Sequence, residues 1–420
     1  MFRDFFQLPP VLKSPNVSCF VIGESVSFFG SWMTKIALVW IVYQLTNSAM
    51  LVGVVGFTNQ IMSLVITPLV GVLLDRWNLK YVLLITQITS IVLSGTLAFL
   101  TFNGHINVTW IIVIGTIQGT VKAFDLPARL VTIPRLVDDK TDAYGAIAIH
   151  SFLMNTAKFV SPMVGGFLIA RYGGASCFLV DSLSYFPFIL AILNTRIKTV
   201  NNNANKERNF LKNLKEGFNY SYSFVPLRYV LILKILVCFM AMTHVNLLPI
   251  FVSEVLNGNA ETMGFLMTAS ALGSIIAGLY LVMRKKATGL GEIIVFAAII
   301  LGLSLILFSR SSNLELCLLI IFVVGMTNSL TLAAIGNFVQ LILADENKRG
   351  RVTSIFTTAV LGILPLGNLF FGALASRVGV ANALLFGGVC CLTGAGFFAR
   401  KLPEMKKIVS PIYIKMGLIQ

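Results

Sequence analysis

The sequence has little charge and few of the residues that build metal centres. Only 12% of its 420 residues are Asp, Glu, Lys or Arg, whereas soluble globular proteins carry about 25%. Its three histidines and six cysteines show no HxxxH, HxxE or CxxC spacing, so we expect no metal site. A composition this poor in charge excludes an ordinary soluble domain.

Motifs of nucleotide hydrolysis and covalent catalysis are absent as well. The chain has no GxxxxGK[ST] phosphate-binding loop and no nucleophile–base signature, so we expect neither an enzyme nor a bound cofactor. The formal net charge of +15 would suit nucleic acid only on a folded soluble face. Because the sequence predicts no such face, we expect no nucleic-acid partner.

Long apolar runs are what the sequence has in abundance. Hydrophobic residues make up 56% of the chain, and a helix needs roughly 20 apolar residues to cross a hydrocarbon core of about 30 Å. Twelve runs reach that length, which predicts an all-α integral membrane protein with twelve transmembrane helices. The expected spans are 17–44, 50–74, 81–103, 107–128, 144–170, 174–194, 229–253, 261–283, 289–309, 313–340, 351–376 and 380–400.

Basic residues are distributed unevenly between the segments that connect these runs. Of the 32 Lys and Arg residues, four lie within runs, 25 lie on one side, and only Arg171, Arg310 and Arg377 lie on the other. Since basic segments resist translocation, the asymmetry predicts that both termini are cytoplasmic.

The chain divides into two similar halves. The polar stretch TRIKTVNNNANKERNFLKNLKEG separates six runs from six, which predicts a six-helix bundle over 1–195, a basic cytoplasmic linker over 196–228 and a second bundle over 229–420. GFLIARYG at 166–173 recurs as GALASRVG at 372–379, an offset of 206. The recurrence predicts two parallel six-helix pseudo-repeats, which is the major facilitator fold.

The loop that follows the second run carries a more specific signal. GVLLDRWNLK resembles the signature loop of the major facilitator superfamily, which combines a Gly, a Leu, an Asp-Arg pair and terminal bases. Asn78 and Leu79 depart from that pattern. The residues that match it are Gly71, Leu73, Asp75, Arg76 and Lys80.

The resemblance implies a gate at the cytoplasmic end. Asp75 would meet the positive N-terminus of the eleventh helix, a contact worth about 0.3–1 kcal/mol when exposed. Asp125 and Arg129, four residues apart, fall on one helical face and suit a supporting ion pair. We therefore expect gating roles for Gly71, Asp75, Arg76, Lys80, Asp125 and Arg129.

Further stretches are similar to a narrower branch of the superfamily, which contains enterobactin exporters and macrolide efflux proteins. They include AFDLPARLVTIPRL from position 123, GSWM at 30–33, QLTNSA at 44–49 and LLPIF at 247–251. SPMVGG at 161–166 resembles the antiporter motif of exporters, with Ser161 in place of its first Gly and Pro162, Gly165 and Gly166 retained. Plain packing of small residues between helices is the alternative interpretation of this motif.

Charged side chains within the runs are the main candidates for substrate and proton binding. Inserting one of them at the centre of a membrane helix costs about 2.5–3.5 kcal/mol, so its presence there needs a reason. Glu24 and Lys35 are eleven residues apart, so both should project on nearly the same helical face. We expect Asp181 to pair with Lys158 or Lys35. A permanent ion pair between helices is the alternative role for each. Lys122 and Lys234 are expected to snorkel to headgroups.

Uncharged polar residues complete the expected pathway. Each of them can donate or accept a hydrogen bond to a substrate, or form one with a neighbouring helix, and the sequence does not distinguish these two roles. His150 and His244 are minor candidates for a proton relay. The uncharged set is Gln60, Gln118, Asn155, Asn246, Asn328 and Asn337.

Together these patterns predict a monomeric transporter in a bacterial inner membrane, with a small molecule, protons and membrane lipid as its partners. We expect a proton-driven exporter of an amphipathic organic molecule, with a siderophore favoured as the substrate. Multidrug or macrolide efflux and import of a metal chelate are the alternatives of the same architecture. A receptor that only binds is a further alternative, and the lack of any sizeable soluble domain counts against it.

Overall fold

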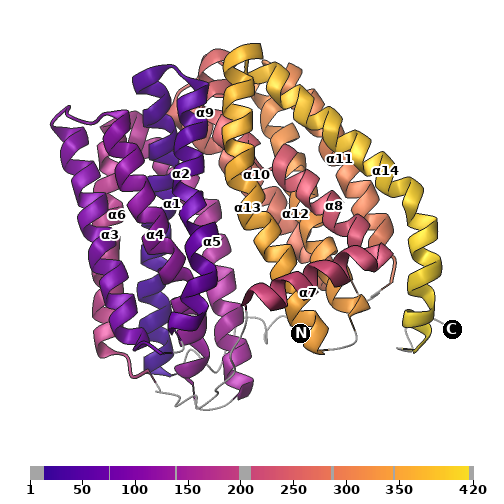
Figure 1. The fold of residues 1–420 in the computed structure, drawn as a ribbon. Coiled ribbons are helices and arrows are strands. Elements are labelled where there is room, and N and C mark those ends of the chain that lie inside the picture. Colours follow the sequence, from indigo (N-terminus) through magenta and orange to yellow (C-terminus); the bar gives the residue numbers. More distant parts are fainter. Residues whose placement is uncertain are drawn as a thin grey trace, which may run out of the picture. The chain divides into compact units, whose positions relative to one another are not determined.

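The chain folds almost entirely into helices (Figure 1). The computed structural model describes residues 14–74, 76–137, 140–197, 210–284, 288–343 and 346–415. Within these residues twelve helical segments are long and apolar enough to cross a membrane, so the expected number of spans is confirmed. Helices suit a bilayer because each of them bonds its own backbone N–H and C=O groups.

The first half contains six long helices, and a short 3-10 helix, η3 (Ile133–Arg135), follows the fourth. They are α1 (Pro15–Thr46), α2 (Ala49–Leu74), α3 (Leu79–Phe102), α4 (Val108–Thr132), α5 (Lys140–Tyr172) and α6 (Gly174–Asn194). The second half contains α7 (Phe210–Ser223), α8 (Val225–Met240), α9 (His244–Glu254), α10 (Ala260–Met283), α11 (Leu290–Arg310), α12 (Leu314–Ile342), α13 (Glu346–Val378) and α14 (Val380–Lys415).

The helices form two compact units with the same order of neighbours. Unit 1 holds α1, α2 from Thr58 onward, and α3 to α6, whereas unit 2 holds the start of α2 up to Phe57 and α7 to α14. In unit 1, α1 packs against α5 and α6, and α3 packs against α4 and α6. In unit 2, α8 packs against α13 and α14, and α11 packs against α12 and α14. The helices of unit 2 thus repeat those of unit 1 in chain order.

Individual turns repeat as well. Asn107 and Asn313 cap α4 and α12, and each accepts a hydrogen bond from a backbone N–H of the first turn, which satisfies a donor that the helix leaves free. Gly173 and Gly379 are single residues between α5 and α6 and between α13 and α14, with φ of 79° and 83°. Both pairs are 206 residues apart, the offset of the sequence repeat.

Gly173 should be intolerant of a side chain, which gives a first testable prediction. With φ 79° and ψ 166°, it occupies a region that is essentially restricted to glycine and costs other residues about 1–3 kcal/mol. We expect Gly173→Ala to lower the melting temperature of the purified protein in detergent. Gly396→Ala, inside α14 with no atom near its added Cβ, is the control, and equal melting temperatures for the two variants would contradict the prediction.

The structure corrects two expected boundaries and adds a helix within the expected linker. The seventh span, expected as one helix over 229–253, is broken between α8 and α9, and the backbone N–H of His244 bonds the Ala241 carbonyl there at 3.2 Å. The expected linker over 196–228 contains the helix α7, whose apolar and polar residues alternate at helical spacing. The last helix continues to Lys415, well past the expected end at 400.

Candidate functional site

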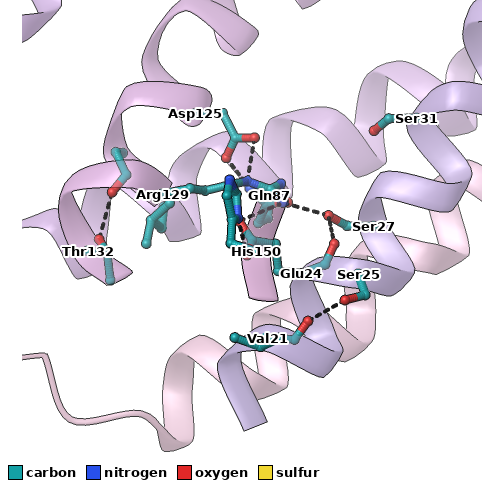
Figure 2. A network of polar contacts seen from close by, with 12 residues as sticks. Val21, Glu24, Ser25, Ser27, Ser31, Gln87, Asp125, Arg129, Thr132 and His150 are labelled. Carbon is teal, nitrogen blue, oxygen red and sulfur yellow. Dashed lines mark hydrogen bonds and ion pairs between the residues drawn. The ribbon is translucent and has the colours of Figure 1, made fainter. Parts of the chain in front are cut away.

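A group of charged side chains is buried in the core of unit 1 (Figure 2). Glu24 of α1 is 1% exposed, and its Oε2 lies 2.9 Å from Nδ1 of His150 on α5. Its other oxygen, Oε1, lies 3.8 Å from Nη1 of Arg129 on α4. Side chains of α1, α4 and α5 therefore meet at one carboxylate.

Arg129 is the hub of this group. Its guanidinium donates through Nη1 to Ser27 Oγ at 2.9 Å and through Nη2 to Gln87 Oε1 at 3.2 Å, and Figure 2 shows these contacts converging. The rings of Phe28 and Phe188 flank its Cζ, with centroids 4.8 and 4.4 Å away. A buried guanidinium needs such hydrogen bonds and aromatic faces because they replace its hydration.

Asp125 lies on the same helix as Arg129 and forms an ion pair with its guanidinium. Its Oδ2 lies 2.8 Å from Nε of Arg129, so the ion pair expected from their spacing is present. Its Oδ1 accepts hydrogen bonds from Gln87 Nε2 at 2.6 Å and Thr86 Oγ1 at 3.1 Å. These bonds link α3 to α4 and fix the carboxylate, so the pair is part of the packed core.

The carboxylates of the group outnumber its guanidinium. Glu24 and Asp125 contribute two negative charges when ionised, and Arg129 contributes one positive charge. The facing atoms of His150 and Glu24 are within hydrogen-bond distance, so one proton can lie between them. Histidine and carboxylate side chains both exchange protons, so this pair has the chemistry of a site that binds and releases one.

A second carboxylate lies deeper along α6. Asp181 is 0% exposed, and its Oδ2 accepts hydrogen bonds from Thr34 at 2.8 Å and Ser94 at 2.7 Å. Gly30 makes this contact possible, since a Cβ at that position would come within 2.8 Å of the Asp181 Cα. The glycine lets α1 and α6 approach closely, which brings Thr34 within reach of the carboxylate.

Several expected partners differ from those in the structure. Among the described residues Asp181 forms no ion pair with Lys35 or Lys158, and two hydroxyl groups bond it instead. Glu24 contacts Arg129 and His150 instead of sharing an open face with Lys35. Lys35 and Lys158 both lie over the ring of Trp32, with Nζ 4.6 and 5.6 Å from its centroid.

The uncharged candidates are scattered. Gln118 is buried, with Nε2 3.5 Å from Ser94 Oγ, whereas Asn155 is exposed and bonds the Ser151 carbonyl of its own helix at 2.8 Å. Gln60 is half-buried on α2. Asn246, Asn328 and Asn337 belong to unit 2. The structure therefore brings only Gln118 next to the carboxylates of unit 1.

The expected gating residues are described in part. Gly71 lies in α2, Asp75 lies outside the described residues, and Arg76 is exposed. Lys80 donates to the carbonyls of Leu193 at 2.7 Å and Thr195 at 3.2 Å, where a cation is favourable at the C-terminus of α6. The cytoplasmic gate involving Asp75 remains a prediction.

The antiporter-like motif lies on the face of α5 that packs against α1. Ser161, Pro162, Gly165 and Gly166 are all buried, and a Cβ on Gly165 would meet Met33 of α1 at 3.5 Å. This arrangement agrees with close packing of small residues between two helices. The same packing is expected for a helix contact that blocks solvent leakage and for ordinary helix packing. The transport role of the motif therefore also remains a prediction.

Sequence reasoning missed the polar residues of α3. Thr86, Gln87 and Ser94 bond the two carboxylates or the guanidinium, yet none of them was expected in the site. Their spacing was a usable signal, because Thr86, Ser90 and Ser94 recur every fourth residue of an apolar run and share one face. Such a polar stripe indicates that the face meets charged groups inside the bundle.

Comparisons with known proteins agree with this architecture. A family model described as a transmembrane secretion effector matches residues 11–413. The chain is 26% identical over 390 residues to the staphyloferrin A transporter of Staphylococcus aureus, covering 92% of this chain and 97% of that protein. It is 23% identical over 371 residues to macrolide efflux protein A of Streptococcus pyogenes, covering 87% and 91%.

A solved structure extends the comparison to three dimensions. The nucleoside transporter NupG matches with a TM-score of 0.70 at 14% identity, covering 92% of this chain and 99% of that one. At this identity the likeness concerns the fold alone.

Proposed function

Because the chain belongs to the transmembrane secretion effector family of major facilitator transporters, we propose that it is a proton-driven exporter of a small amphipathic organic molecule. We infer that the molecule is a siderophore, which the likeness to a staphyloferrin A transporter supports. The protein works as a monomer in a bacterial inner membrane, with both termini cytoplasmic. As a secondary transporter it draws its energy from an ion gradient.

The observation that carries proton coupling is the contact between Glu24 and His150 beside Arg129. Loss of the shared proton leaves an uncompensated negative charge in a region of low dielectric, where it is costly. The three side chains come from α1, α5 and α4, so proton occupancy changes how strongly these helices attract one another. A ligand that binds two conformations unequally shifts their populations, and a proton acts here as such a ligand.

Asp181 is the second candidate for a proton carrier. Its carboxylate is fully buried, bonded by two neutral hydroxyl groups, and forms no ion pair among the described residues. A buried carboxyl without a cationic partner has the chemistry to bind and release a proton. Its position on α6 gives the exporter a proton site distinct from the Glu24–His150 pair.

The culture medium of a deletion strain tests the function. Under iron limitation we expect the medium to lose one secreted iron chelator, measured by chelator assay and mass spectrometry, because the deletion removes its proposed exporter. The wild-type gene should restore the chelator, and an Asp75→Asn gene should not, since Asp75 would hold the cytoplasmic gate.

Two results would contradict the proposal. An unchanged medium with increased sensitivity to macrolides would favour drug efflux, which the likeness to macrolide efflux protein A supports as the second candidate function. Accumulation of a metal chelate in right-side-out vesicles, without accumulation in inverted vesicles, would favour import. Full restoration by the Asp75→Asn gene would remove the gate and leave the export function in place.

A further inference from the structure

We propose that Lys35 and Lys158, which lie beside Trp32 in unit 1, bind an organic polyanion together with Lys122 and so select a substrate that carries several carboxylates. The inference rests on the proposed function and narrows its substrate class. It concerns a part of unit 1 that is distinct from the Glu24–Arg129–His150 group.

The three lysines converge from three helices. Trp32 and Lys35 lie on α1, Lys122 on α4 and Lys158 on α5. The ammonium groups of Lys35 and Lys158 share the Trp32 ring, at 4.6 and 5.6 Å from its centroid. Lys122 and Lys158 both repel Lys35 electrostatically, so the three positive charges act on one region.

Their depth keeps them away from the lipid headgroups. Lys122 was expected to snorkel because its helix was expected to end at 128, but α4 continues to Thr132 and is followed by η3. Lys122 and Lys158 therefore lie close to the midpoints of α4 and α5. Since a lysine reaches headgroups only from near the end of a membrane helix, these two must be stabilised by something else.

The described part of the chain supplies no carboxylate for this purpose. Lys35, Lys122 and Lys158 form no ion pair with any described residue. The nearest negative charges are Asp125 and Asp181, which act on Lys122 electrostatically. Both are already bonded by other side chains. Intramembrane cations are nearly always paired or face a water-filled cavity, so these lysines are suited to a partner that brings its own negative charge.

Protein atoms cover the lysines only in part. Lys122 is exposed, and Lys35, Lys158 and Trp32 are half-buried, in contrast to Glu24, Arg129 and Asp181, which are fully buried. Like charges this close destabilise one another in a medium of low dielectric, and a polyanion reverses that repulsion. The exposed part of the Trp32 ring offers an apolar surface to the carbon skeleton of the same molecule.

Fluorescence of Trp32 provides the test. In full-length protein with Trp40, Trp77 and Trp110 replaced by Phe, Trp32 is the remaining tryptophan and should report any ligand on Lys35 or Lys158. The probes are citrate, its neutral triester triethyl citrate, and inorganic phosphate. We expect a saturable change with citrate, none with the triester, and a weaker response to phosphate, which carries fewer charges.

Lysine variants test whether citrate binding depends on the charges of Lys35 and Lys158. Removal of both charges in Lys35→Gln/Lys158→Gln should raise the half-saturating citrate concentration roughly tenfold or more, because charge-assisted contacts are lost. Lys234→Gln should leave it unchanged, although Lys234 is also half-buried and lies 5.3 Å from the ring of Phe356. If the tryptophan-poor protein does not fold, calorimetric titration of the lysine variants with citrate answers the same question.

Equal citrate binding by the wild type and the double lysine variant would overturn the inference, as would an equal response to the triester. Phosphate binding as strong as citrate binding would overturn the selection of an organic polyanion. The experiments distinguish failure of the lysine site from failure of the proposed export function. Lysine-dependent citrate binding with an unchanged culture medium would refute siderophore export but support the lysine site. Loss of the chelator from the medium, with citrate binding that does not depend on the lysines, would support export but refute the lysine site.

Discussion

Glu24→Gln is expected to abolish the stimulation of transport by a pH gradient while leaving substrate exchange intact. Glutamine keeps the shape of the side chain but takes up no proton. Arg129 and Asp125 remain paired in this variant, so the core keeps its shortest ion pair and should fold. Coupling free energies of about 1–3 kcal/mol correspond to roughly 5- to 150-fold effects, and we expect a loss of stimulation in that range.

The measurement uses proteoliposomes and the molecule identified in the culture medium. One assay follows uptake driven by an imposed pH gradient, and the other follows exchange of labelled for unlabelled substrate without a gradient. Glu315→Gln, which removes an exposed carboxylate at the start of α12, is the control and should behave as wild type. Undiminished gradient-driven transport by Glu24→Gln would exclude Glu24 as the proton carrier and leave Asp181, to be tested as Asp181→Asn.

Arg129→Met should destabilise the protein far more than the loss of a surface ion pair does. It removes the cation that faces the buried Glu24 and the partly buried Asp125, and Gln87 and Ser27 lose the hydrogen bonds that it donates. Removing one member of a buried ion pair typically costs about 3–5 kcal/mol. We expect a correspondingly large drop in the melting temperature, measured by loss of the monodisperse chromatographic peak after heating.

Two comparisons make the Arg129 experiment specific. Lys401→Met breaks a 3.2 Å pair with Glu404 that is exposed on both sides, and such surface pairs contribute only about 0–1 kcal/mol. Asp125→Asn, added to Arg129→Met, removes one of the stranded charges and should recover part of the loss. Equal destabilisation by Arg129→Met and Lys401→Met would show that the buried group contributes no more to stability than an exposed ion pair does.

The membrane helices could be predicted because their cause is local. A run of about 20 apolar residues must form a helix in a bilayer wherever its neighbours lie, so the run at 174–194 matches α6 from end to end. The repeat was equally readable, and Gly173 and Gly379 give it a structural reason, since both sharp connections need the same rare backbone conformation. The break after α8 was missed because hydrophobicity continues across it.

The partners within the site were harder to predict because they depend on packing between distant helices. His150 lies 126 residues from Glu24, and nothing in the local spacing of either residue links them. Asp125 and Arg129 are the exception, since four residues on one helix determine their proximity. At the offset of 206, the equivalent positions in unit 2 hold Thr331 and Ile335, so the repeat itself gives no guide to the charged group.

The distance in sequence between Glu24 and His150 also has a consequence for biogenesis. Chains are synthesised at about 5–20 residues per second, so roughly 6–25 s pass between the two residues at the ribosome. During this interval α1 enters the bilayer with an acidic side chain whose histidine and arginine do not yet exist. The nascent helix therefore carries Glu24 without the two side chains that later contact it. Assembly of unit 1 therefore begins with an unfinished contact that only the arrival of α4 and α5 completes.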